Sequence, residues 1–359
     1  MNKKCLGCGI LLQTIKENEL GFVPNIENDF CDRCYQLKHF NKKFKTHLDA
    51  IEYFKIINKE IKKFKTIILV VDCFNLTASI NESLLNILKN KKVILLINKV
   101  DLLPKSYKLH KMQDLINEII PLQIEKTFFI SAEKKYNIDA LVDYLNKTKI
   151  NKIPLIGMAN VGKSSLVNTI IKSKNPKTKN LIIVSPYSGT TLDCIEKELE
   201  NITIIDTPGL INEKNIINYL DKKSIKKLTP KKEIKPTTFQ LNDDNSLFIT
   251  SLLQIDFLQG MKTSFTIYCS NEIKIHRTKT EKTEELRDKF LYTKLFTLPE
   301  EKMNFKFINK KIKIPKEKML FVSGIGFITF NNKKTIEIGI TIPDILEYKV
   351  VDTIFKERK

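Results

Sequence analysis

The sequence predicts an α/β protein with a small cysteine-rich module before its central domain and an α+β region after it. Between about residues 66 and 206, short apolar runs alternate with helical stretches, which is typical of a mostly parallel sheet with helices on both faces. Two Cys-x-x-Cys pairs precede this pattern, and a lysine-dense stretch follows it. The length of 359 residues suits about two or three domains, so we expect domains at 1–48, 49–215 and 216–359.

The composition is that of a soluble globular protein with a polyanionic partner. Hydrophobic residues make up 42% and charged residues 28% of the chain. Lys and Arg exceed Asp and Glu by 61 to 41, and the resulting charge of +20 favours binding to RNA. The alternative is that lysine codons are simply abundant in an AT-rich genome. No apolar run approaches the ~20 residues that span a bilayer, and no signal segment opens the chain, so we expect a cytoplasmic protein without a membrane partner.

The predicted elements of the central domain follow one another from an amphipathic helix at 51–65, where Ile51, Phe54, Ile57, Ile61 and Phe64 recur at helical spacing. Strands are expected at 66–72, 93–98, 127–131, 153–157, 194–199 and 202–206. Helices are expected between them at 81–89, 109–120, 138–146 and 164–173. The lysine-dense stretch at 222–235, which Pro230 and Pro236 punctuate, is expected to be a linker to the C-terminal region.

A glycine-rich loop after the fourth of these strands predicts a phosphate-binding site. Gly157–Ser164 fits the pattern GxxxxGK[ST], lies between a strand and a helix, and so presents backbone N–H groups to phosphates. Lys163 is expected to reach the β and γ phosphates, and the Ser164 hydroxyl to bind Mg²⁺. The residues expected to contact nucleotide here are Gly157, Asn160, Val161, Gly162, Lys163, Ser164 and Ser165.

Two later segments complete a magnesium and γ-phosphate site. Asp206-Thr207-Pro208-Gly209 ends a strand, which suits a carboxylate that holds the magnesium shell and a glycine N–H that meets the γ-phosphate. The loop Ser188–Asp193 offers a threonine to the metal, and we favour Thr191 over Thr190. The expected magnesium-binding residues are therefore Ser164, Thr191 and Asp206.

A third motif selects guanine. Asn98-Lys99-Val100-Asp101 matches NKxD, and the Asp101 carboxylate can accept two hydrogen bonds that only guanine donates. Two such bonds are worth ~3–6 kcal/mol, or about 10²–10⁴ in affinity. Lys99 is expected to pack along the ring, and Asn98 to tie neighbouring loops together. Ser131-Ala132 resembles the SAK motif, in which the alanine N–H meets the guanine carbonyl, although Glu133 stands where that motif has lysine. We therefore expect GTP and GDP as ligands.

The order of these motifs is circularly permuted. In ordinary GTPases the phosphate loop comes first, whereas here Asn98–Asp101 and Ser131–Ala132 precede Gly157–Ser164 and Asp206–Gly209. Strand neighbours in space can survive this rearrangement, because a doubly wound sheet can open at one loop and close at another. The segment after Gly209 leads directly into the lysine-rich stretch, so loss of the γ-phosphate could be sensed there.

The two cysteine pairs predict a zinc site. Cys5, Cys8, Cys31 and Cys34 form two knuckles that can supply four thiolates to tetrahedral Zn²⁺. A redox pair or a site that has lost its metal is the alternative. His39 and His47 lie in a basic stretch and are expected to be surface residues. The remaining cysteines of the seven stand alone, as expected in a reducing compartment.

With these motifs in place, the chain resembles the YqeH family of circularly permuted GTPases along nearly its whole length. The resemblance implies a ribosome biogenesis factor that acts in small-subunit assembly, with the small subunit or its precursor rRNA as partner. The GTPase motifs are specific, whereas the likeness of the C-terminal region rests on its position. RsgA-type permuted GTPases differ, since they carry an N-terminal barrel and a zinc site after the GTPase domain.

The motifs also bear on mechanism. Leu210 occupies the position where familiar small GTPases have a glutamine that orients water, so intrinsic hydrolysis is expected to be slow. Asn160 matches an asparagine that helps K⁺-stimulated GTPases bind the cation, and the alternative is that it caps its loop. The expected catalytic residues are Lys163, Thr191, Gly209 and Asn160. We expect the protein to be a monomer. Two other functions remain as alternatives: a nucleotide-dependent RNA-binding module with negligible turnover, and an RNA-modifying factor with an auxiliary GTPase.

Overall fold

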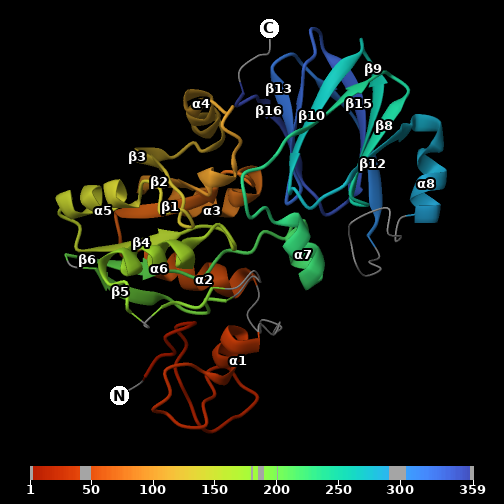
Figure 1. Cartoon of the computed structure of the whole chain (residues 1–359). Coiled ribbons are helices and arrows are strands. Elements are labelled where there is room, and N and C mark those ends of the chain that lie inside the picture. The colour runs from red at the N-terminus through yellow and green to blue at the C-terminus, as the bar shows by residue number, and fades with distance from the viewer. Residues whose placement is uncertain are drawn as a thin grey trace. The chain divides into compact units, whose positions relative to one another are not determined.

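A computed structural model describes residues 3–40, 50–178, 181–184, 190–199, 201–290 and 305–355. Ser188 and His47, which were named above, lie outside the described residues. The chain forms two compact units, of which the first comprises Met1–Val100 with Pro121–Asn212 and the second comprises Asp101–Ile120 with Glu213–Lys359 (Figure 1). Among the described helices, none has the length and apolar character needed to cross a membrane.

The first unit is built on a six-stranded sheet. Its strands lie in the order β3-β2-β1-β4-β6-β5, and only β5 runs antiparallel to its neighbour. The bounds are β1 Thr66–Asp72, β2 Lys92–Asn98, β3 Gln123–Phe129, β4 Lys152–Ile156, β5 Ile195–Leu199 and β6 Ile202–Asp206. The phosphate-loop strand β4 is fourth in the sequence but pairs with both β1 and β6. The predicted α/β fold with permuted motif order is confirmed.

The central strands are buried on both faces, which explains why their sequences are continuous apolar runs. Every residue of β1 from Ile67 to Asp72 is buried, because helices cover both faces of a parallel sheet. The edge strand β5 instead alternates buried and exposed residues. The sheet core is therefore formed by the strands whose carboxyl ends carry the nucleotide motifs.

The helices of the first unit are α1 Asp32–Phe40, α2 Ala50–Ile61, α3 Glu82–Leu88, α5 Ile138–Lys147 and α6 Lys163–Lys174. The Asn81 side chain caps α3 by accepting the Leu84 N–H, at 2.8 Å. In α2 the buried face consists of Tyr53, Ile57 and Ile61 at four-residue spacing, whereas Ile51 is exposed. The expected apolar stripe was therefore wrong at Ile51, because Tyr53 takes the core position one turn before Ile57.

The second unit consists mainly of two antiparallel five-stranded sheets, in the orders β16-β13-β14-β10-β7 and β11-β8-β9-β15-β12. The strands are β7 Thr237–Leu241, β8 Asn245–Ile249, β9 Leu253–Gln259, β10 Thr263–Cys269, β11 Ile275–Lys279, β12 Phe307–Ile314, β13 Lys318–Val322, β14 Gly326–Phe330, β15 Ile336–Pro343 and β16 Tyr348–Asp352. The helices are α4 Leu109–Ile119, α7 Lys222–Leu228 and α8 Thr283–Phe290. Four fully buried phenylalanines lie in these sheets: Phe257, Phe265, Phe321 and Phe327. Among the described residues, strands outweigh helices in this expected α+β region.

The segment Asp101–Ile120 groups with the C-terminal residues and not with the nucleotide-binding sheet. The Leu102 carbonyl accepts the Ile234 N–H at 2.9 Å, and the Lys108 N–H donates to the Ile354 carbonyl at 2.8 Å. Helix α4 also packs against β16. The linear boundary expected at residue 215 does not describe this arrangement, because backbone hydrogen bonds between distant segments draw α4 into the second unit.

The lysine-dense stretch is partly helical and is not the simple linker that the sequence suggested. Asp221 caps α7 by accepting the N–H groups of Lys223 and Ser224, at 2.7 and 3.0 Å. Ile225 and Leu228 are buried, three positions apart on one side of the helix. The stretch belongs to the second unit, and most of its lysines are exposed.

Candidate nucleotide and metal sites

The loop between β4 and α6 has the backbone geometry of a phosphate cradle. Gly157 and Gly162 have φ angles of 157° and 97°, which favour glycine. A Cβ at Gly157 would lie 2.4 Å from the Val70 carbonyl oxygen, and one at Gly162 would lie 2.4 Å from Asn98 Nδ2. No side chain caps α6. The helix N-terminus therefore keeps its N–H groups and its partial positive charge for an anion.

Lys163 is held inside this loop. Its side chain is buried, and its Nζ donates to the carbonyl oxygens of Gly157 at 2.9 Å and Met158 at 3.0 Å. Burial lowers the pKa of Lys163 to about 8, and the charge of Asp206 opposes this shift. A phosphate beside the ammonium group would stabilise its charged form.

Three oxygen-bearing side chains converge next to the loop. Ser164 Oγ donates to Asp206 Oδ2 at 2.7 Å, and Thr191 Oγ1 lies 3.4 Å from Ser164 Oγ and 3.5 Å from Asp206 Oδ2. Burial raises the pKa of Asp206 to about 6, and its Oδ1 has no hydrogen-bond partner among the described residues. Hydroxyl and carboxylate oxygens of this kind are what Mg²⁺ prefers, so these residues fit the metal.

The segment after β6 lies directly against the phosphate loop. The Ala159 N–H donates to the Leu210 carbonyl at 2.7 Å, and the Leu210 N–H donates to the Gly157 carbonyl at 3.3 Å. A Cβ at Gly209 would lie 2.7 Å from Ala159 Cα, so this close approach requires glycine. The Leu210 side chain is buried and carries no polar atom that could orient water.

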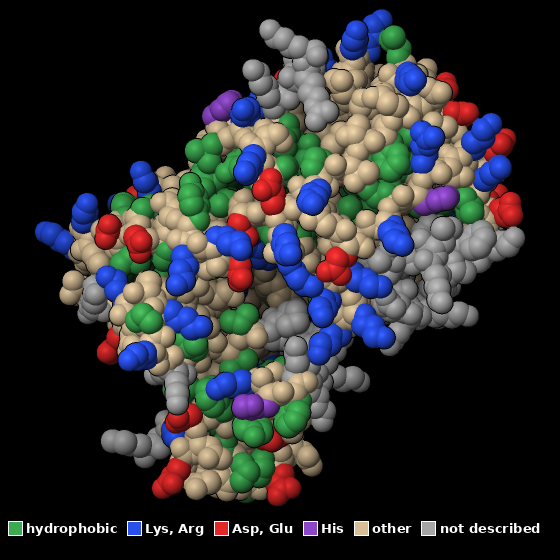
Figure 2. Space-filling model, viewed as in Figure 1, with side chains coloured by type: hydrophobic (Ala, Val, Ile, Leu, Met, Phe, Trp, Pro, Cys, Tyr) green, Lys and Arg blue, Asp and Glu red, His purple; other side chains and the backbone are tan. Residues whose placement is uncertain are grey.

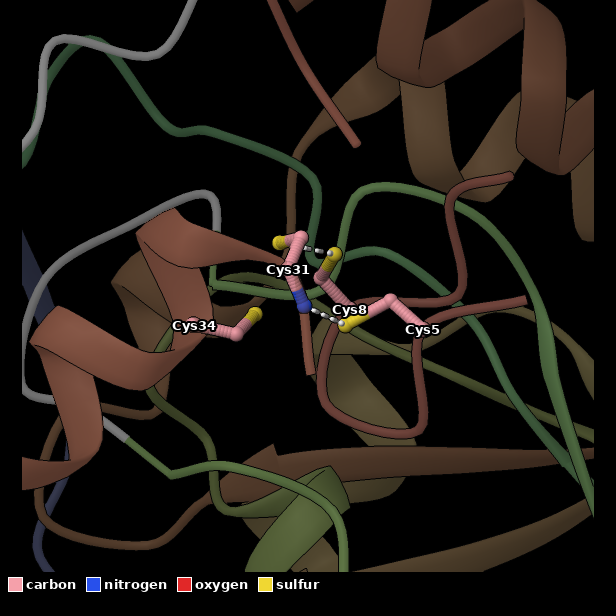
Figure 3. A group of neighbouring side chains, drawn as sticks. All are labelled: Cys5, Cys8, Cys31 and Cys34. Carbon is pink, nitrogen blue, oxygen red and sulfur yellow. Dashed lines mark hydrogen bonds between the residues drawn. The ribbon is translucent and has the colours of Figure 1, made fainter. Parts of the chain in front are cut away.

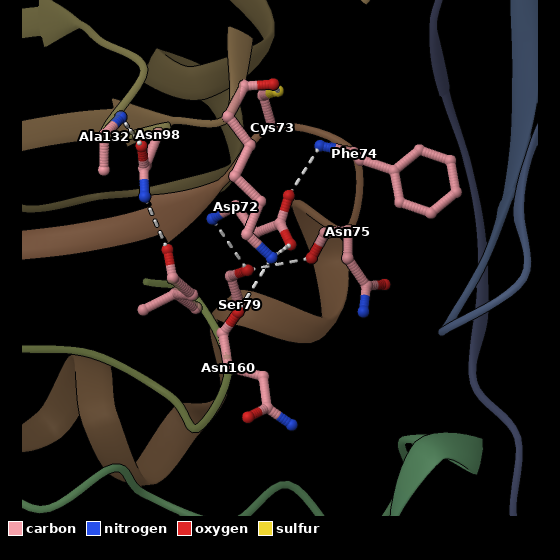
Figure 4. Close-up of polar contacts among 10 residues, drawn as sticks. Asp72, Cys73, Phe74, Asn75, Ser79, Asn98, Ala132 and Asn160 are labelled. Carbon is pink, nitrogen blue, oxygen red and sulfur yellow. Dashed lines mark hydrogen bonds and ion pairs between the residues drawn. The ribbon is translucent and has the colours of Figure 1, made fainter. Parts of the chain in front are cut away.

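Asn98 links the loops around the expected base site (Figure 4). Its Nδ2 donates to the Val161 carbonyl at 2.9 Å, and its Oδ1 accepts the Ala132 N–H at 3.1 Å. Ser131 is fully buried, and its Oγ accepts the Lys134 N–H. For the Ala132 amide to meet a guanine carbonyl, as the SAK resemblance implies, it must share or exchange its bond to Asn98.

Asp101 follows in the short 3₁₀ helix Val100–Leu102 and is half-buried. The Val100 N–H donates to the Ile130 carbonyl at 3.2 Å. This bond holds the backbone of the NKxD motif beside the strand end that leads into Ser131 and Ala132.

Asp72 is a site residue that the motifs did not reveal. Its Oδ2 forms an ion pair with Lys99 Nζ at 2.6 Å, and the same ammonium donates to the Asn160 carbonyl at 2.8 Å (Figure 4). Its Oδ1 accepts the Phe74 N–H, which holds the carboxylate in place. The available signal was a carboxylate at the end of an apolar strand, and Asp72 pairs in register with Asn98 on the adjacent strand.

The four predicted zinc ligands come together (Figure 3). The sulfur atoms of Cys5, Cys8, Cys31 and Cys34 all lie within 4.8 Å of one another, and all four residues are buried. The Cys31 N–H donates to Cys5 Sγ at 3.3 Å. Four such sulfurs fit a tetrahedral Zn²⁺ site.

His39 does not belong to this cluster. It is exposed, and its ring lies against Tyr35 with 4.4 Å between the ring centroids. The expectation that it is a surface residue is confirmed.

Three protein-family models match successive parts of the chain. A model described as "Ethanolamine utilisation - propanediol utilisation" matches residues 46–147, and one described as "50S ribosome-binding GTPase" matches residues 152–249. A model described as "YqeH-like, C-terminal" matches residues 262–354. The first two matches divide close to the point where the permutation places the phosphate-loop strand.

Individual proteins show the same relationships. The chain is 34% identical over 294 residues to the protein YqeH of Bacillus subtilis, which covers 79% of this chain and 80% of that protein. It is 33% identical over 178 residues to GTPase Der of Aquifex aeolicus, covering 45% of this chain and 38% of that protein. The solved structure of YjeQ from Thermotoga maritima is 30% identical and covers 41% of this chain and 49% of that chain, with a TM-score of 0.29.

The identity to YqeH extends over most of both chains, and the C-terminal match is specific to the same family. Together with the permuted order of the strands and motifs, these matches identify the chain as a GTPase of the circularly permuted YqeH family.

Proposed function

We propose that this GTPase acts in ribosome biogenesis in the cytoplasm, where it binds the small ribosomal subunit or its precursor rRNA under the control of GTP. The main support for GTP binding is that Ser164, Thr191 and Asp206 converge beside a phosphate loop that contains a lysine. The description "50S ribosome-binding GTPase" for the model over residues 152–249 supports a ribosomal partner. The choice of the small subunit rests on the YqeH resemblance, and the experiment on lysines below tests it.

The proposed chemistry follows from the site. Lys163 exchanges its two carbonyl contacts for oxygens of the β and γ phosphates, which satisfies its buried charge. Ser164, Thr191 and Asp206 would hold Mg²⁺, which supplies charge neutralisation to the phosphates. The Gly209 N–H, beside the phosphate loop, would donate to the γ-phosphate. Because Leu210 cannot orient water, the unassisted reaction is slow.

The proposed RNA contact lies on the helix α7 and the residues that follow it. Figure 2 shows Lys and Arg side chains gathered in this region of the surface. Four exposed lysines have no carboxylate within ion-pair distance among the described residues: Lys223, Lys226, Lys232 and Lys235. Lys231 instead pairs with Glu272 at 3.3 Å. Free ammonium groups on a folded support can replace counterions along a phosphate backbone.

We expect Asp101→Asn and Asp72→Asn to weaken guanine-nucleotide binding in different ways. Loss of two bonds to the base should lower the affinity of Asp101→Asn for GTP by about 10²–10⁴ and shift its preference to xanthosine triphosphate. Asp72→Asn weakens only the support of Lys99, so GTP and GDP affinities should both fall by about threefold to tenfold while guanine preference remains. Fluorescent-nucleotide titrations measure both. Unaltered base preference in Asp101→Asn would disprove its role as the base-reading residue.

Purified protein should contain about one equivalent of zinc per chain, because four thiolates form one tetrahedral site. Cys34→Ser should lose the metal and still bind GTP, since the six-stranded sheet has its own core. Cys194→Ser, outside the cluster, is the matched control and should keep its zinc. Elemental analysis that finds no zinc in wild-type protein prepared without chelators would exclude a zinc site.

We expect GTP hydrolysis to speed up when K⁺ replaces Na⁺ at equal ionic strength. Asn160 has a φ of 66°, so Asn160→Gly removes the side-chain amide without straining the backbone. This variant should bind GTP and lose the difference between the two salts. Equal wild-type rates in K⁺ and Na⁺ would leave Asn160 as a loop residue only.

Replacing Lys223, Lys226, Lys232 and Lys235 with glutamine should weaken subunit binding and flatten its dependence on log salt by about three. GTP affinity should be unchanged, since the phosphate loop is formed by Gly157–Ser164 and includes none of these lysines. A matched variant replaces four other exposed lysines of the second unit: Lys310, Lys311, Lys333 and Lys334. Titrations with purified small and large subunits at several KCl concentrations measure the slope. Preferential binding to the large subunit would overturn the choice of partner, and an unaltered slope would exclude α7 as the contact.

A further inference from the structure

We propose that the four-cysteine module is a positioning element for catalysis, which holds the segment 190–193 so that Thr191 faces the magnesium site. The inference rests on the proposed role of Thr191 in binding Mg²⁺. Module and segment both belong to the first unit. The proposal rests on contacts between these two segments, which lie near opposite ends of that unit's sequence.

A single carbonyl in the first knuckle binds the segment directly after Thr191. The Cys8 carbonyl oxygen accepts the N–H of Leu192 at 2.9 Å and the N–H of Asp193 at 3.0 Å. The peptide group that follows a metal-ligating cysteine thus fixes the two amides that follow Thr191. Its orientation depends on the conformation of the Cys-x-x-Cys knuckle, which a bound metal determines.

Side chains of the module bind the same segment on both sides. Arg33, which lies between the second pair of cysteines, donates from Nη1 to the Thr190 carbonyl at 3.4 Å. Lys4, adjacent to Cys5, forms an ion pair with Asp193 at 2.8 Å. This pair is largely exposed and contributes little by itself, so the backbone bonds and the apolar contacts must provide most of the support.

Apolar packing makes the cysteines and the segment one buried cluster. Leu192 and Ile183 belong to the same buried hydrophobic cluster as the four cysteines and Tyr53 of α2. The fit is close: a Cβ at Gly7 would lie 2.6 Å from Ile183 Cδ1. Gly9 has a φ of 83°, and a Cβ there would lie 2.6 Å from the Asp193 carbonyl oxygen. The two surfaces therefore touch without room for an added methyl group.

Thr191 lies between these attachments and faces the opposite way. Its neighbours Thr190, Leu192 and Asp193 contact the module, while its own Oγ1 lies near Ser164 and Asp206. Over residues 3–40 the module has as many Asp and Glu as Lys and Arg, and Lys42, Lys43 and Lys45 follow in its basic stretch. The contacts with segment 190–193 all lie within 3–40, so support of the segment accounts for this part of the module without an RNA contact.

The expected consequence is specific to the magnesium-dependent step. Releasing the segment would withdraw the Thr191 hydroxyl from the metal and leave the phosphate loop and the base loops in place. GDP affinity should therefore change little. The Mg²⁺ concentration needed for half-maximal GTP hydrolysis should rise.

The test compares two glycine variants of the full-length zinc-loaded protein. Gly9→Ala places a methyl group against Asp193, whereas Gly21→Ala strains the module at a similar φ of 87° but against Leu11, away from the segment. Hydrogen exchange at the Leu192 and Asp193 amides should quicken about tenfold in Gly9→Ala, the effect of losing two backbone hydrogen bonds. The magnesium requirement should rise by a similar factor. Gly21→Ala protein that retains its zinc should match wild type in both measurements.

Metal removal provides the second arm. Cys34→Ser should show the same faster exchange at these two amides without any added nucleotide. The Lys4→Ala/Arg33→Ala variant leaves the sulfur ligands intact and removes only the side-chain part of the contact, so it should quicken this exchange by less, about twofold. Unchanged exchange at Leu192 and Asp193 after zinc loss would overturn the proposal.

The two hypotheses fail separately. Faster exchange together with an unchanged magnesium requirement would show that the module supports the segment but that Thr191 does not bind the metal, which contradicts the proposed magnesium site and with it this inference. A wild-type protein without magnesium-dependent hydrolysis would contradict the proposed function, and the exchange measurement would still report on the contact.

Discussion

The parallel pairing of β4 with β1 on one side and β6 on the other is the constraint on which the nucleotide site depends. Leu155 of β4 pairs with Ile68 of β1 and with Asp206 of β6. The carboxyl ends of these strands therefore meet at one edge of the sheet, with Asp72, the phosphate loop and Asp206 side by side. Hydrogen bonds between strands do not depend on the order in which the chain supplies them, so permuted motifs can still assemble one site.

The site contains two buried charges that a stable core would normally avoid. Lys163 and Asp206 are both desolvated. Burial lowers the pKa of Lys163 and raises the pKa of Asp206, so it favours the neutral form of each side chain. Their Coulomb interaction opposes these shifts only in part. Asp206 Oδ1 has no hydrogen-bond partner among the described residues, which is a second unfavourable feature of this buried site. Departures from good core design are expected where a ligand supplies the missing interactions, here phosphate and Mg²⁺.

The cysteine module has a different physical basis. Besides its four cysteines, the apolar side chains that it buries among its described residues are those of Leu12, Val23 and Leu37, so a metal is expected to contribute much of its folding free energy. Its cysteines nevertheless form a common buried cluster with Leu192 and Ile183. Metal binding, local folding and the position of Thr191 are therefore linked through direct contacts in one unit. Such a link explains why a GTPase domain with its own core would carry an additional metal-dependent element.

Features that depend on local chemistry could be predicted from the amino-acid sequence. Glycines at the positions of Gly157 and Gly162, a carboxylate at the end of β6 and cysteines at two-residue spacing are required by backbone conformation, metal coordination or ligand contact, and each leaves a short pattern. The strands of the parallel sheet were also predictable, because burial on both faces requires continuous apolar runs.

Contacts between segments distant in the chain became visible only in the folded protein. The ion pair of Asp72 with Lys99, the bonds from the Leu192 and Asp193 amides to the Cys8 carbonyl, and the grouping of Asp101–Ile120 with the C-terminal strands have no sequence pattern. Backbone amides and carbonyls are present at almost every position, and an aspartate at a strand end can serve many roles. The packing of the sheets and loops determines which of these groups form contacts, and the spacing of residues along the chain does not predict it.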